Sequence, residues 1–232
     1  MSVSIASARS INWATGTMPT NARNALGMFD RANIELDGVD SALIDQCRQQ
    51  DAAAFESIVN RYKNKVYNFV YRMISNPEDA EDITQEVFLR VYTRIHRFRG
   101  DSSFQTWLFR IATNLCVDRG RKLKRQVQQA TSLNQPLADH GEEGSGAGRD
   151  IPDLLSDPYR AVARGELQQV VQDGLGRMSE KLRAVVVLYD IQGLSYEEIS
   201  QTLGVPMGTV KSRLFNARAE LARRIKGYVV PG

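Results

Sequence analysis

Cysteine and histidine are scarce in this chain, which has two of each among its 232 residues. Cys47 and Cys116 form no CxxC or Cys/His spacing, so we expect no zinc site built from this chain alone. His96 and His140 stand alone in the sequence, without the pattern of a nucleophile or a metal site around them. We therefore assign no catalytic residue, no metal ligand and no cofactor. Two isolated cysteines are typical of a reducing cytosol, where both remain thiols.

Long apolar runs are also missing. No run approaches the roughly 18 residues that span a bilayer, and the N-terminus lacks the basic and apolar segments of a secretory signal. The composition is 42% hydrophobic and 25% charged, which is ordinary for a globular protein of one or two domains. The net charge of +3 says little about nucleic acid, whereas the distribution of charge along the chain says more.

The chain divides into four segments by composition. Residues 1–35 lack periodicity, and we expect a disordered N-terminal extension, although a start codon placed too far upstream explains them equally well. Residues 36–125 and 158–232 show helical periodicity, and no segment shows strand alternation. Residues 126–157 are rich in Gln, Gly, Pro and acids and predict a flexible linker with a root-mean-square span of roughly 30 Å. The predicted fold is all-α, with two small helical domains joined by this linker.

Two helices dominate the first domain. The clearer one follows Asn76-Pro77 and has one apolar stripe, with Phe88 beside it. A break at Gly100 comes before a second helix, for which Asp101, Ser102 and Ser103 offer N-cap side chains. The expected buried positions are Ile83, Val87, Val91 and Ile95 on the first helix and Phe104, Leu108, Ile111 and Leu115 on the second.

A helix-turn-helix is predicted between Ser195 and Ile225. Ser195 and Glu198 have the spacing of a capping box, and Gly204 ends the first helix where a left-handed residue is favoured. Pro206 suits the start of the second helix. Its buried stripe is expected at Val210, Leu214, Ala217, Leu221 and Ile225.

The second of these helices has a basic outer face. Between Met207 and Lys226 there are six basic residues and one acid, and such a helix fits a major groove. Phe215 is unusual on a solvated face, and an apolar contact to a thymine methyl group would account for it. The alternative is an αα-hairpin whose basic face is only solvated, with Phe215 packed on a neighbouring helix. We favour DNA binding because cap, turn and charge agree.

The helix after Pro77 also has a negative face, with one exposed leucine. This face is typical of a docking surface for a basic partner helix, but acids are favoured at a helix N-terminus in any case. Periodicity alone supports these two interpretations equally. The face consists of Asp82, Gln85, Glu86 and Leu89.

The segment from Arg110 to Arg125 reverses the sign of the charge, with six basic residues and one acid. Aromatic residues precede and enter this segment, and aromatics interleaved with positive charge suit single-stranded nucleic acid. Phe104 and Leu108 are more simply core residues, and Trp107 can pack rather than stack on a base. Asn114 can read a base edge or cap a local backbone group.

Three motifs carry a resemblance to a known family. They are EDITQEVF at 81–88, FRGDSSFQTWL at 98–108 and GTVKSR at 208–213. In this order, around a linker, they resemble a bacterial extracytoplasmic-function (ECF) sigma factor of the sigma-70 family, close to the sigma-E type. The resemblance covers about 180 residues. It implies that residues 36–125 are sigma region 2 and residues 158–232 are sigma region 4.

The resemblance also implies partners and roles. Region 2 would dock on the β′ clamp of core RNA polymerase and would melt and read the promoter −10 element. Region 4 would read the −35 element as duplex and touch the β flap, while the acidic linker (Asp139, Glu142, Glu143, Asp150, Asp153) would run through the RNA exit path. An anti-sigma factor would hold the chain inactive. The expected location is cytoplasmic, at the nucleoid or, with such an inhibitor, at the inner membrane face. No small-molecule substrate and no enzyme activity are implied.

The site residues implied by the resemblance fall into three sets. The core polymerase set is Asp82, Gln85, Glu86 and Leu89. The −10 set is Phe98, Arg99, Asp101, Ser102, Trp107, Arg110, Asn114, Arg119 and Arg121. The −35 set is Tyr196, Thr209, Lys211, Ser212, Arg213, Phe215, Asn216 and Arg218. Asn216 departs from the family, where arginine is common at that position.

Two rival functions differ in what they leave unexplained. A two-domain helix-turn-helix regulator that acts without polymerase accounts for the C-terminal motif but not for the acidic face or the aromatic-basic segment. A nuclease or helicase accessory would need a carboxylate cluster or a phosphate loop, and the sequence has neither.

Overall fold

The computed structural model describes residues 37–133 and 158–229. Residues 1–35, for which we expect disorder, lie outside this part of the chain. So do most of the predicted linker, its acidic residues and His140. Within the described ranges all regular elements are helices and there is no strand. The predicted all-α fold is confirmed.

The first helical set consists of α2 (Asp37–Arg48), α3 (Ala52–Ile74), α4 (Pro77–Arg94), the 3₁₀ turn η3 (Ile95–Arg97) and α5 (Phe104–Leu133). Asp51 caps α3 by accepting from the backbone amides of Ala53 and Ala54. Asn76 caps α4 through a 2.9 Å bond from the Asp79 amide, and Pro77 occupies the first turn, where its missing N–H costs nothing. The predicted stripe on α4 and its continuation at Ile95 are buried, as expected.

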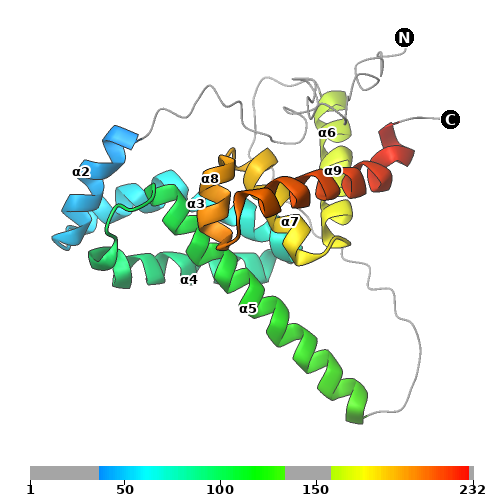
Figure 1. The fold of residues 1–232 in the computed structure, drawn as a ribbon, viewed down its shortest axis with the longest axis horizontal. Helices are drawn as coiled ribbons and strands as arrows, with labels where there is room; N and C mark the ends of the chain where they lie inside the picture. Colours follow the sequence, from blue (N-terminus) through cyan, green and yellow to red (C-terminus); the bar gives the residue numbers. More distant parts are fainter. Residues whose placement is uncertain (1–36, 134–157, 230–232) are drawn as a thin grey trace.

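Helix α5 begins where the sequence predicts and ends later. The Ser103 hydroxyl accepts a 3.1 Å bond from the Thr106 amide and caps the helix. The helix then runs past Arg125, where we placed the domain boundary, to Leu133. Residues 121–133 contain neither glycine nor proline, so nothing in them stops a helix. The C-terminal half of α5 projects away from the other helices (Figure 1).

The second set consists of α6 (Pro158–Gly176), α7 (Glu180–Val186), the π-helical segment η4 (Val187–Ile191), α8 (Tyr196–Leu203) and α9 (Met207–Val229). Helices α8 and α9 form the predicted helix-turn-helix. Both halves of the capping box at Ser195 and Glu198 are present, and Gly204 ends α8 with φ 63°. The predicted buried stripe of α9 is buried at all five positions.

The two helical sets pack directly on each other. Helix α8 lies on α5, and α6 and η4 lie on α3 (Figure 1). The buried apolar residues of both sets form a single cluster. None of the described helices is both long enough and apolar enough to cross a membrane.

Candidate nucleic-acid interface

The outer face of α9 is open to solvent. Lys211, Ser212, Phe215 and Asn216 are all exposed, and Thr209 and Arg213 are half-buried beside them. Phe215 is 67% exposed, so it does not pack on a neighbouring helix as the alternative interpretation required. An apolar ring among polar and basic side chains on an open helix face is suited to contact base edges and thymine methyl groups.

A stack of four side chains holds this face in place. Lys211 Nζ lies 5.6 Å from the centroid of the Tyr196 ring, and that ring stacks on Tyr189 at 4.9 Å. The Arg218 guanidinium lies over the Tyr189 ring, 5.1 Å from its centroid. Cation–π contacts and stacking thus join α9 to α8 and η4.

Arg218 has a different environment from the other members of the predicted −35 set. Its guanidinium donates two hydrogen bonds to the Asp190 carboxylate, which is only 7% exposed. The Arg218 side chain itself is 18% exposed. This buried bidentate ion pair ties α9 to η4.

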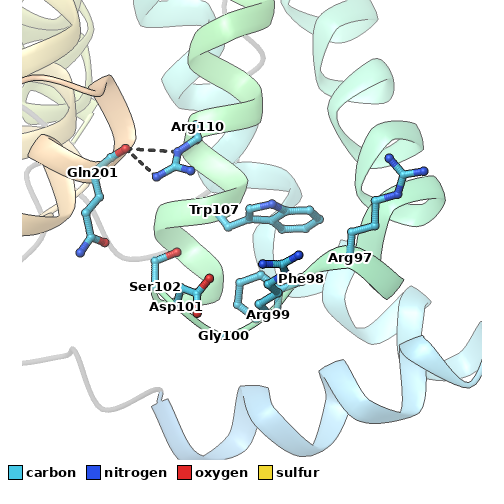
Figure 2. Close-up of a pocket in the computed structure, with 9 residues that line it drawn as sticks. All are labelled: Arg97, Phe98, Arg99, Gly100, Asp101, Ser102, Trp107, Arg110 and Gln201. Carbon is cyan, nitrogen blue, oxygen red and sulfur yellow. Dashed lines mark hydrogen bonds between the residues drawn. The ribbon is translucent and has the colours of Figure 1, made fainter.

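The second predicted DNA surface contains a pocket of about 370 Å³ at the loop before α5 (Figure 2). A single loop and the first two turns of α5 bring most of the predicted −10 residues together. The pocket is lined by Arg97, Phe98, Arg99, Gly100, Asp101, Ser102, Trp107, Arg110 and Gln201. Gly100 has φ 79°, a left-handed conformation that favours glycine and turns the loop.

Aromatic packing shapes this loop. Phe98 is buried and lies 5.3 Å from the Trp107 ring centroid, and Phe104 lies 5.8 Å from it. Phe98 is therefore a support for the pocket rather than a free stacking platform. Trp107 is partly buried and lines the pocket.

Arg48 of α2 is a residue that sequence reasoning missed. Its guanidinium donates to the Phe98 carbonyl and lies 5.9 Å from the Phe98 ring centroid. It thereby ties α2 to the loop that forms the pocket. The two residues are 50 positions apart, so no local pattern could have revealed this contact.

The other predicted −10 residues lie further along α5. Asn114 is exposed but does not line the pocket. Arg119 pairs with Asp79 of α4, and Arg121 lies 3.8 Å from Asp118 on an exposed surface. The structure therefore gives Arg119 a partner within the domain and leaves Asn114 open.

The acidic face of α4 is exposed on the opposite side of that helix from its buried stripe. Asp82 and Gln85 are exposed, and Glu86 is half-buried and pairs with Arg90 at 2.7 Å. Leu89 is 58% exposed, and Tyr92, one turn from it, is 52% exposed. Two large apolar side chains beside acids on one open face are typical of a protein-docking surface. Tyr92 is an addition to the predicted set.

No group of three or more His, Cys, Asp or Glu side chains within 37–133 and 158–229 is arranged to hold a metal ion.

Comparison with known proteins matches both helical sets. Residues 58–126 match the family model described as Sigma-70 region 2, and residues 168–221 match the one described as Sigma-70, region 4. The chain is 39% identical over 183 residues to the ECF RNA polymerase sigma factor SigW of Bacillus subtilis, covering 79% of this chain and 95% of that protein. It is 35% identical over 194 residues to the ECF RNA polymerase sigma-E factor of Escherichia coli, covering 82% and 96%.

Two solved structures share the fold. One is the sigma factor RpoE in complex with the anti-sigma factor NepR from Bartonella quintana, with a TM-score of 0.56 and 24% identity over 74% of this chain and 96% of that one. The other is CnrH in complex with the cytosolic domain of CnrY, with a TM-score of 0.56 and 20% identity over 80% and 96%.

Proposed function

This chain belongs to the ECF group of sigma-70 RNA polymerase sigma factors, and from that premise we propose that it binds core RNA polymerase and directs promoter-specific initiation. Region 4 reads the −35 element as duplex through α9, and region 2 captures the −10 element as melted strand at the loop pocket. The polymerase set is Asp82, Gln85, Glu86 and Leu89, with Tyr92 beside them. The observation that carries the proposal is the presence of both readers in one chain, an open recognition helix and a loop pocket.

The two readers need different chemistry, and the described side chains fit each. For duplex, Lys211 and Arg213 supply positive charge beside Phe215 and Asn216, which suits phosphates and base edges in a major groove. For a melted strand, the pocket offers an aromatic side chain, Trp107, together with Arg99 and Arg110. Capturing an unstacked base there offsets part of the cost of melting.

The promoter geometry requires the two readers to separate. Elements centred near −10 and −35 lie about 25 base pairs apart, which is roughly 85 Å at about 3.4 Å per base pair. Two small domains in direct contact are too compact to reach both. Residues 134–157 could bridge at most about 80 Å when fully extended. When polymerase holds both regions, binding of one promoter element makes binding of the other intramolecular.

We also propose control by an anti-sigma factor and a cytoplasmic location, at the nucleoid or, with a membrane-bound inhibitor, at the inner membrane face. The support is the family membership and the similarity to a sigma factor held by the anti-sigma factor NepR. No catalytic role is proposed for any residue of this chain.

A reciprocal pair of variants tests the division of labour. We expect Asp82→Arg with Glu86→Arg to weaken binding to core polymerase by at least about tenfold, or about 1.4 kcal/mol, because it reverses the charge of the docking face. Lys211→Ala with Arg213→Ala should leave core binding intact and reduce run-off transcription by about tenfold or more, since a good base contact contributes about 1–3 kcal/mol. Core affinity is measured by fluorescence titration and initiation by run-off transcription.

The control for the docking variant is Glu56→Arg with Glu166→Arg, which makes the same change in charge at exposed positions elsewhere. It should bind core normally. A chain that neither binds core nor directs initiation would be a regulator that acts without polymerase. Loss of core binding in the Lys211 and Arg213 variant would show that the roles are wrongly divided.

A further inference from the structure

Region 4 caps a helix of region 2. Helix α3 ends at Ile74, and its last carbonyls need partners from outside the helix. Gln172 of α6 donates from Nε2 to the Tyr71 carbonyl at 3.0 Å and to Ser75 Oγ at 2.8 Å, and its Oε1 accepts from Arg72 at 3.2 Å. Gln172 is 4% exposed. Each of these hydrogen bonds crosses between the two regions.

A buried arginine completes this cap. Arg183 of α7 donates to the Met73 carbonyl of α3 and also to the carbonyls of Gly176 (2.6 Å) and Met178 (3.0 Å) in its own region. A cation at a helix C-terminus is favoured by the helix dipole. The C-terminus of α3 is therefore recognised by both a neutral amide and a guanidinium from region 4.

A second contact runs along α5. One stripe of this helix runs beside its core face and is mostly polar. At helical spacing it contains Thr106, Arg110, Thr113, Gly120 and Lys124. At one end Glu198 Oε1 of α8 accepts from Ser103 Oγ at 3.2 Å and from Thr106 Oγ1 at 3.4 Å. At the other end Lys124 pairs with Glu180 of α7 at 2.6 Å. We call Thr106, Arg110, Thr113, Gly120 and Lys124 the α5 stripe.

The middle of this contact reaches the loop pocket. Arg110 donates to the Gln201 carbonyl at 2.7 Å from Nη2 and at 3.2 Å from Nε, as Figure 2 shows. Gln201 lines the pocket together with the loop of region 2. An arginine proposed to face the −10 strand is therefore engaged by region 4, and α8 forms one wall of the base pocket.

The other two functional surfaces stay open in the same arrangement. Leu89 on the docking face and Phe215 on the recognition face are among the most exposed large apolar side chains of the described residues. The contact between regions thus lies at one side of the loop pocket and leaves these two surfaces open.

We propose that region 4 is a reversible intramolecular lid on the base pocket of region 2, held by Gln172 and Arg183 on α3 and by Glu198 and Gln201 on α5. In the free chain the lid closes one side of the pocket and engages Arg110 without any inhibitor protein. The effect on DNA rests on the proposed −10 role of the pocket, whereas the closed arrangement does not.

The composition of the contact favours reversibility. Thr113 Oγ1 on the α5 stripe and Thr202 Oγ1 on α8 are buried without a hydrogen-bond partner in the structure. A buried unpaired hydroxyl is unfavourable, and both would gain water if the helices parted. Such polar contacts are typical of interfaces between domains that move.

A charge-matched pair of full-length variants tests the lid. Gln172→Lys puts a cation against Arg72 and removes an acceptor, whereas Gln168→Lys adds the same charge at an exposed position one turn earlier on α6. Spin labels are placed at Glu78→Cys on α4 and Arg223→Cys on α9, both exposed. The native cysteines are buried and do not compete for the label.

Distances measured between the two spin labels should give one narrow distribution for the parent chain and for Gln168→Lys. For Gln172→Lys we expect a broader distribution shifted by more than about 10 Å, as expected for domains released on a tether. A broad distribution in the parent, or identical distributions in the two variants, overturns the proposal. If Gln172→Lys loses helicity, Gln172→Met, which keeps the side-chain length and removes the hydrogen bonds, takes its place.

Two further measurements separate the lid from the DNA role. With Trp13→Phe in the background, Trp107 is the only tryptophan, and acrylamide should quench it more strongly in Gln172→Lys. A fluorescein-labelled random single-stranded 15-mer should bind Gln172→Lys several-fold more tightly than Gln168→Lys. Unchanged quenching overturns the lid. Increased quenching with unchanged 15-mer binding supports the lid and instead contradicts the proposed −10 role of the pocket.

Discussion

Cys116 shows how burial sets the chemistry of a single residue. It lies on α5 with 3% of its surface exposed, and loss of water around the thiol raises the pKa of Cys116 to about 12. An unfolded cysteine ionises near pH 8.5–9. The folded chain therefore keeps a proton that the unfolded chain loses between about pH 9 and 12.

This difference makes stability depend on pH. The contribution of the neutral thiol is complete below about pH 9 and is lost as pH rises toward 12, at about 1 kcal/mol per pH unit. Cys116→Ala removes the titrating group, so the stability advantage of the parent over this variant should shrink by about 1 kcal/mol between pH 9 and 10. Urea unfolding at both pH values measures it. An advantage that stays constant would mean that the thiol is not desolvated.

Residue roles were predictable where they depend on local pattern and not where they depend on a distant partner. The exposure of Lys211 and Phe215 followed from the helical spacing of the buried stripe of α9. Arg218 lies on the same basic helix, but its partner Asp190 is 28 positions away, and no local pattern reveals that pair. Arg48 escaped notice for the same reason.

The turn between α8 and α9 allows a test at the scale of an element. Gly204 has φ 63° and Gly208 lies in the first turn of α9, and a Cβ added at either position would meet nothing within 4 Å. Only backbone conformation therefore distinguishes them. We expect Gly204→Ala to lower the free energy of unfolding by about 1 kcal/mol, and Gly208→Ala to raise it by about 0.5–1 kcal/mol.

Chemical denaturation followed by circular dichroism measures both variants. Opposite signs for one substitution made twice in one motif would identify the left-handed turn as the cause. If both variants lose stability equally, the turn does not explain the preference for glycine at Gly204.

Helices and their caps were largely predictable because their signals are local. Asn76-Pro77, Ser103, Ser195 with Glu198, and Gly204 each act within a few residues of their position. The α5 stripe was not predictable, since its meaning depends on α7 and α8, which come after the linker. The same helix also ends later than expected. The change in composition at residue 126 suggested a linker, but residues 126–133 contain no helix breaker.

At the scale of the molecule, a tether predicts the range of distances between two domains but not their preferred contact. The sequence indicates two helical domains and three functional surfaces, and the family comparison agrees with the two regions. The contact itself depends on the fit of Gln172 and Arg183 to the end of α3. Neither residue belongs to a motif. In the sequence alone, each is an ordinary polar residue on a helix.

A closed chain should bind polymerase less tightly than its open form. Suppose that core polymerase binds only chains in which the two regions are apart. The apparent dissociation constant for polymerase then equals that of the open chain divided by the fraction of chains that are open. Gln172 makes three hydrogen bonds across the contact, and each contributes about 0.5–1.5 kcal/mol. Gln172→Lys should therefore bind core polymerase about tenfold more tightly than Gln168→Lys, although neither residue lies on the docking face.

Fluorescence titration of labelled chains with core polymerase measures this difference, and the shared charge change removes non-specific attraction from the comparison. The gain cannot exceed the reciprocal of the open fraction in the parent, so its size also reports how closed the free chain is. Equal affinities, in variants whose spin-label distances differ, would mean that core engages the exposed α4 face of the closed chain. Region 4 would then leave the pocket only after docking, and the lid would act on promoter capture instead of on polymerase binding.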